Sequence, residues 1–141
     1  MRVLSLDLGE RRIGVAISDA LGLTAQGVTV LERRSPEADT EAIKTLVAER
    51  QVTAVVIGLP LTLKGERGPQ AQRAAAFARR LQETLNVPVE LVDERFTTAQ
   101  GEKALLELGS SRKKRKQVID RVAAQLILQQ YLDAKQTQRG A

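Results

Sequence analysis

The chain has 141 residues, which fits one domain that is large enough to bury a hydrophobic core. It contains 22 lysine and arginine residues against 17 aspartate and glutamate residues, and this net charge of +5 favours a polyanionic partner such as nucleic acid. It contains no cysteine and no histidine, which excludes disulfide bonds, thiolate chemistry and an imidazole general base. Catalysis by this chain would have to use carboxylates, lysine, hydroxyl groups or a bound metal ion.

The first part of the chain predicts an antiparallel meander of three strands. Val3–Leu8 is a run of strand formers, residues 13–18 form a second strand after a turn at 9–12, and residues 28–31 form a short third strand. Asp7 stands out in the first strand because its neighbours are apolar. By alternation, Asp7 shares a face of the sheet with the residues two and four positions before it.

Helices and strands alternate after the meander. Ser35 and Pro36 are a typical N-cap and first helical residue, and the run at 53–57 is nearly all apolar, as in a central strand covered on both faces. We predict, in chain order, a helix at 36–50, a strand at 53–57, a helix from Pro69, a strand at 87–93, a helix at 98–108, a polar basic loop at 110–117, a last helix at 118–135 and a frayed tail at 136–141. This order predicts a single α/β domain over residues 1–135 with a mixed sheet.

Three carboxylates stand where acidic residues are unusual. Asp7 is near the end of the first strand, Glu94 follows the strand at 87–93, and Asp120 shares a face of the last helix with apolar residues. Carboxylates that converge repel each other unless a cation lies between them. Mg²⁺ or Mn²⁺ prefers oxygen ligands, and two such ions about 4 Å apart can promote in-line displacement at a phosphate. This chemistry needs neither histidine nor cysteine.

Each carboxylate also has a simpler interpretation. Asp7 could point to solvent or cap the turn, Glu94 could belong to a charged loop, and Asp120 could stabilise the N-terminus of its helix. Asp93 and Glu94 point to opposite faces of their strand, and the sequence leaves open which of them would face a metal ion.

Basic residues accompany these carboxylates. The run at 112–116 could hold a phosphate backbone, or it could be a solvated loop. Further arginines lie in turns near the expected site. The residues predicted to contact nucleic acid are Arg11, Arg12, Arg95, Arg112, Lys113, Lys114, Arg115 and Lys116. Only 2% of residues are aromatic, so recognition should use backbone shape rather than base stacking.

Four segments resemble the YqgF/RuvX family, whose fold is RNase H-like. They are LDLGERRIGVAISD at 6–19, VIGLPLTLKGERG at 56–68, VDERFTT at 92–98 and VIDRVAAQLILQQYL at 118–132. The resemblance implies a mixed five-stranded sheet flanked by helices, with the three meander strands antiparallel and the later strands parallel. It also implies that Asp7, Glu94 and Asp120 are the catalytic metal ligands, for Mg²⁺ or Mn²⁺. At Arg11 the family often has lysine, so the charge is kept with a different shape.

The function implied by the resemblance is a metal-dependent endonuclease that matures the 5′ end of pre-16S ribosomal RNA or resolves four-way (Holliday) DNA junctions. Two other hypotheses stay open. The chain could be a non-catalytic RNA-binding factor of ribosome assembly, or the hairpin with Asp7, Gly9 and Gly14 could bind a nucleotide phosphate as in actin-like ATPases. Dimers occur in the wider fold group, so a homodimer is compatible with the resemblance. No apolar run approaches ~20 residues and no signal peptide is recognisable, so we expect a cytoplasmic protein without a membrane partner.

Overall fold

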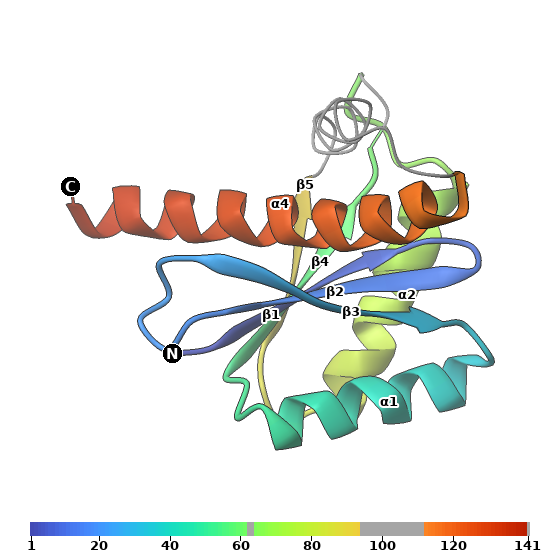
Figure 1. Cartoon of the computed structure of the whole chain (residues 1–141), viewed down its shortest axis with the longest axis horizontal. Coiled ribbons are helices and arrows are strands. Elements are labelled where there is room, and N and C mark those ends of the chain that lie inside the picture. Colours follow the sequence, from blue (N-terminus) through green and yellow to red (C-terminus); the bar gives the residue numbers. More distant parts are fainter. Residues whose placement is uncertain (62–63, 94–111, 141) are drawn as a thin grey trace.

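A five-stranded mixed sheet forms the centre of the molecule (Figure 1). The computed structural model describes residues 1–61, 64–93 and 112–140, with the side chains of residues 1–61, 64–93 and 121–135. The strands are β1 (Val3–Leu8), β2 (Arg12–Ser18), β3 (Ala25–Glu32), β4 (Ala54–Leu59) and β5 (Val89–Asp93), in the spatial order β3-β2-β1-β4-β5. The pairs β1–β2 and β2–β3 are antiparallel, whereas β1–β4 and β4–β5 are parallel. This arrangement confirms the predicted sheet.

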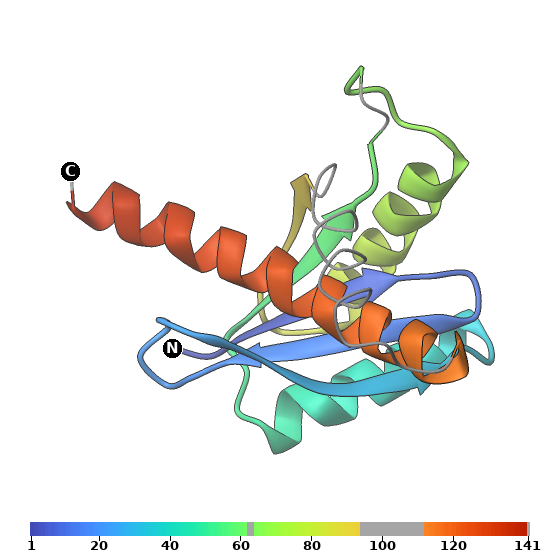
Figure 2. The same cartoon turned by 45° about the horizontal axis from the view of Figure 1, so that its top comes forward.

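Helices cover both faces of the sheet. The helices α1 (Pro36–Glu49) and α2 (Pro69–Thr84) lie on one face, and the long helix α4 (Arg112–Gly140) crosses the other (Figures 1 and 2). Each face has its own hydrophobic cluster. Leu4 and Leu6 of β1 belong to the cluster under α1 and α2, whereas Val3 belongs to the cluster under α4. Alternation along β1 therefore assigns odd-numbered residues to the α4 face.

Local sequence explains where α1 and β4 begin. The Ser35 side chain accepts a hydrogen bond of 3.1 Å from the backbone N–H of Ala38, and Pro36 is the first helical residue. β4 lies between two parallel neighbours, and its residues 55–57 are fully buried, as its apolar sequence predicts. The carboxyl ends of β1, β4 and β5 consequently meet at one edge of the sheet.

Two predicted elements have wrong boundaries. The third strand is longer than the predicted 28–31, and the last helix begins at Arg112 rather than at 118, so residues 112–117 are helical and not a loop. Lysine and arginine are good helix formers, and a charged run without apolar periodicity gives no other sign of a helix. α4 continues as far as Gly140, through most of the residues predicted as a tail. The helix predicted at 98–108 lies outside the described residues.

Candidate active site at the carboxyl end of β1

Asp7 lies at the carboxyl end of β1, between two neighbouring strands. It is opposite Gly14 of β2, and the residue before it, Leu6, is opposite Ile57 of β4. Asp7 is half-buried and, as an odd-numbered residue of β1, belongs to the α4 face. The predicted position of Asp7 in the first strand is confirmed, and its face is the one that alternation assigns.

A tight turn follows Asp7 and connects β1 to β2. The N–H of Gly9 donates a hydrogen bond of 2.9 Å to the carbonyl of Arg12. A Cβ atom at Gly9 would lie 2.8 Å from the same carbonyl oxygen, so only glycine fits without a shift of the backbone. The N–H of Arg33 donates to the carbonyl of Arg11 at 2.9 Å, which ties the turn to the end of β3. The backbone beside Asp7 is therefore fixed from two sides.

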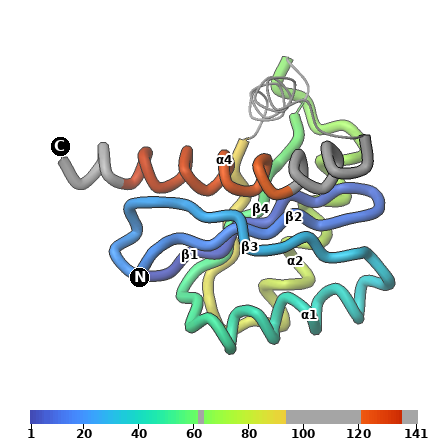
Figure 3. The backbone as a smooth tube through the Cα atoms, in the orientation of Figure 1, coloured from blue at the N-terminus to red at the C-terminus, as the bar shows by residue number. Residues whose placement is uncertain are grey.

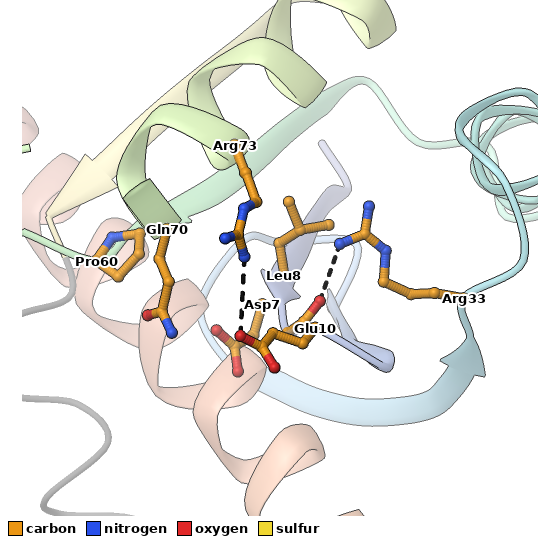
Figure 4. Close-up of a pocket in the computed structure, with 8 residues that line it drawn as sticks. Asp7, Leu8, Glu10, Arg33, Pro60, Gln70 and Arg73 are labelled. Atoms are coloured by element: carbon orange, nitrogen blue, oxygen red, sulfur yellow. Dashed lines mark hydrogen bonds and ion pairs between the residues drawn. The ribbon is translucent and has the colours of Figure 1, made fainter. Parts of the chain in front are cut away.

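A cavity of about 190 Å³ opens beside Asp7 (Figure 4). Its lining combines two carboxylates, two guanidinium groups and one amide from three separate parts of the chain. The lining residues are Asp7, Leu8, Gly9, Glu10, Arg33, Pro60, Gln70 and Arg73. The carboxylates offer oxygen donors of the kind that Mg²⁺ or Mn²⁺ prefers, whereas the guanidinium groups are suited to an anion.

Arg33 is held in the wall of this cavity by contacts on several sides. Its Nη1 donates to the carbonyl of Gly9 at 2.9 Å, and its Nε donates to Oδ2 of Asp39 at 3.4 Å. The guanidinium also lies 5.9 Å from the centre of the Phe77 ring. Asp39 is itself buried and accepts a second hydrogen bond, of 3.0 Å, from the N–H of Arg34. Arg33 therefore keeps one orientation.

α4 is fastened to the sheet by polar contacts, one of them at Ser5, two residues before Asp7 on β1. The buried Ser5 hydroxyl donates to the carbonyl of Ala124 at 2.6 Å. At the edge strand β3, Ala25 accepts from Gln125 Nε2 at 3.1 Å and donates to Gln129 Oε1 at 3.1 Å, while Gly27 approaches Arg121. The helix therefore runs antiparallel to β3 and hence to β1, and its described middle part crosses β1, β2 and β3 (Figure 3). Its N-terminal half points toward the carboxyl end of β1.

The other predicted site residues lie in the turn after β1 and at the start of β2, on α4 or outside the described part of the chain. Arg12 pairs with Glu32 at 3.9 Å, and Arg11 is exposed in the turn. Glu94 and Arg95 lie outside the described residues. The five basic residues 112–116 and Asp120 lie on α4, but their side chains are outside the described part of the structure. Among the described side chains, no group of three or more potential ligands could hold a metal ion alone.

Sequence reasoning missed four polar residues of the cavity, which are Glu10, Arg33, Gln70 and Arg73. One signal could have identified two of them. Gln70 and Arg73 belong to the first turns of the helix that follows β4, and ligands in such sheets collect at the carboxyl ends of parallel strands. Arg33 follows β3, an antiparallel strand, and carried no comparable signal.

Comparison with known proteins gives a consistent assignment. The family model RuvX, described as Holliday junction resolvase, matches residues 1–134. A relative from Myxococcus xanthus, named "Putative pre-16S rRNA nuclease", is 52% identical over 134 residues, which cover 95% of this chain and 89% of the relative. A relative of the same name from Halothermothrix orenii is 50% identical over 133 residues, which cover 94% of this chain and 95% of the relative.

Solved structures agree on the fold. RuvC of Thermus thermophilus in complex with a Holliday junction substrate superimposes with a TM-score of 0.59 at 14% identity, covering 96% of both chains. The Fowlpox virus resolvase in complex with junction DNA gives a TM-score of 0.56 at 12% identity, covering 96% of this chain and 99% of the other. Both neighbours have the RNase H-like architecture. None of the described helices of this chain is apolar and long enough to span a bilayer. The chain therefore belongs to the RuvX family, a family of nucleases.

Proposed function

We propose that this RuvX-family nuclease is a metal-dependent endonuclease with Asp7, Glu94 and Asp120 as its catalytic metal ligands, and that its substrate is structured nucleic acid. The 5′ end of pre-16S ribosomal RNA is the first candidate substrate, because the relatives at about 50% identity are named for it. A four-way DNA junction is the second, from the description of the family model. A ribosomal RNA precursor as substrate would place the protein in the cytoplasm.

The contact between Ser5 and Ala124 is the observation that carries this proposal. From Ser5, Asp7 lies two residues further along β1, a distance of about 7 Å. From Ala124, Asp120 lies four residues back along α4, a rise of about 6 Å. Because α4 runs antiparallel to β1, both steps lead in the same direction from the 2.6 Å contact. This register supports a ligand pair formed by Asp7 and Asp120.

The direction of β5 favours Glu94 over Asp93 as the third ligand. Val92 packs against the cluster under α4, and Leu91 packs against the cluster on the opposite face. Asp93, the last residue of β5, alternates with Val92 and so belongs to the face of Leu91, away from Asp7. Glu94, the neighbouring carboxylate, is the one that an extended alternation would assign to the α4 face.

The chemistry of the proposed site follows from its oxygen donors. Divalent ions held there would supply charge stabilisation and an activated water for in-line displacement at a phosphodiester. The protein would hold the ions in place through β1 and α4, whose relative position the Ser5 hydroxyl fixes. Arg11, Arg12, Arg95 and the basic run 112–116 would neutralise backbone phosphates around the cut.

The test compares the wild-type protein with Asp7→Asn and with a control, Asp19→Asn. Asp19 also follows a strand of the first hairpin, but at the opposite end from Asp7. Each protein is incubated with Mg²⁺ or Mn²⁺ and with a labelled pre-16S 5′ leader RNA or a labelled four-way DNA junction. We expect metal-dependent cutting of one substrate by the wild type and Asp19→Asn, and none by Asp7→Asn. Binding of both substrates without cutting would instead indicate a non-catalytic assembly factor.

A further inference from the structure

Two arginines of the cavity beside Asp7 have no part in the proposed metal site. Arg33 follows β3, and Arg73 lies near the start of α2 (Figure 4). The Arg33 side chain is 23% exposed, forms an ion pair with Asp39 at 3.4 Å and donates to the Gly9 carbonyl, so its guanidinium is held in the cavity wall before any ligand binds. This cavity wall is therefore preorganised for an anionic group.

Arg73 differs from Arg33 because its ion pair is loose. Its Nη1 lies 3.8 Å from Oε1 of Glu10, and the two side chains are 58% and 72% exposed. Exposed pairs of this kind contribute little to stability. Arg73 can therefore exchange Glu10 for another anion at small cost.

The cavity continues away from Asp7 along the start of α2. A second cavity of about 410 Å³ shares Glu10, Pro60, Gln70 and Arg73 with the first and extends to Leu61, Gly68 and Pro69. Arg73 thus stands where the two cavities join. The first turn of α2 contains no acidic residue, and its N-cap residue is a glycine without a capping side chain, so no negative group of the helix opposes an anion there.

We propose that this joined surface is a subsite for one backbone phosphate of the nucleic acid, adjacent to the phosphate attacked at Asp7. Arg73 binds that phosphate in place of Glu10, and Arg33 contributes a fixed positive charge from the opposite wall. The proposal deepens the nuclease function and rests on it. It directs one strand of the substrate from Asp7 toward the link between β4 and α2, with recognition through the phosphate and not through the bases.

The first experiment measures binding of the labelled RNA leader, without divalent metal, across a salt series. Arg73→Ala is compared with Arg79→Ala, which removes an exposed arginine from the same helix away from the cavity. We expect Arg73→Ala to weaken binding about threefold to tenfold and to reduce the slope of log K against log salt by about one. Arg79→Ala should change neither by a comparable amount. Glu10→Gln should strengthen binding, because it removes the anion that competes for Arg73.

The second experiment introduces one uncharged methylphosphonate linkage at a time into the leader. A single linkage should weaken binding by the wild type and have no further effect on Arg73→Ala, since both changes remove the same contact. If the wild type cuts the leader while Arg73→Ala matches Arg79→Ala in affinity and salt slope, the subsite is refuted and the nuclease function stands. If the wild type cuts neither the leader nor the junction, the proposed function itself fails.

Discussion

The Ser5→Ala substitution tests whether one buried hydroxyl sets the position of α4. The hydroxyl donates 2.6 Å to the carbonyl of Ala124, and both residues are fully buried. Its removal deletes one hydrogen bond, but the carbonyl keeps its partner within the helix. We therefore expect the free energy of unfolding to fall by about 1 to 2 kcal/mol, and Tm by about 3 to 6 °C. The folded protein should remain the dominant species.

Activity should fall by more than this loss of stability explains. A shift of α4 would change the separation of the proposed ligands, and a misplacement of about 1 Å can cost about a hundredfold in rate. The assay measures cutting of the preferred substrate against metal concentration, well below Tm, and we expect a lower rate and a higher metal requirement.

The matched control for this prediction is Ser18→Ala. Ser18 is a buried serine whose hydroxyl accepts a hydrogen bond of 2.8 Å from the N–H of Val3, at the end of β1 opposite Asp7. Its loss should lower Tm by a similar amount and leave the metal requirement unchanged. If Ser5→Ala and Ser18→Ala have the same cutting rate and metal dependence, the argument that Ser5 positions the site is refuted.

Three further predictions concern single side chains. Asp39→Ala should lower the free energy of unfolding by about 2 kcal/mol, because the buried carboxylate accepts hydrogen bonds from the Arg33 side chain and from the backbone N–H of Arg34. A denaturant titration measures this change, and an unchanged midpoint would contradict the prediction. The pKa of Asp19 is lowered below its ordinary 3.8, chiefly by the hydrogen bond from the N–H of Leu23. The Asp19 carboxylate therefore stabilises the fold at neutral pH, and this effect is lost as the pH falls through its folded-state pKa. Asp19→Asn should flatten the acid limb of a plot of Tm against pH. Burial is the largest cause that raises the pKa of Tyr131, and the neighbouring Glu90 raises it further. Tyr131 is the single tyrosine in the chain, so the absorbance titration of the protein should have a midpoint above 10.0. Glu90→Gln should lower that midpoint only in part.

The position of Asp7 in its strand could be predicted from the sequence, and most of the residues around it could not, for physical reasons. Alternation within β1 is a local property, so the face of Asp7 follows from six residues. The role of Ser5 depends on Ala124, 119 residues away, and no local pattern contains that partner. Arg33 and Arg73 are ordinary charged residues in sequence, and they become neighbours only through the lengths of β3 and the link before α2. Local patterns made Asp7, Glu94 and Asp120 candidates, and the resemblance to a family favoured them as the proposed ligand set over the simpler interpretations.

The helix α4, which packs on the first hairpin, is translated long after that hairpin, and this order has a consequence during synthesis. β1 and its aspartate leave the ribosome before the helix that covers them. A nascent chain that lacks α4 therefore has the apolar α4 face of β1, β2 and β4 uncovered, with Val3, Ala16 and Val56 exposed, and lacks Asp120 altogether. If Asp120 is a metal ligand as proposed, cutting activity requires a chain that has been translated at least through this residue.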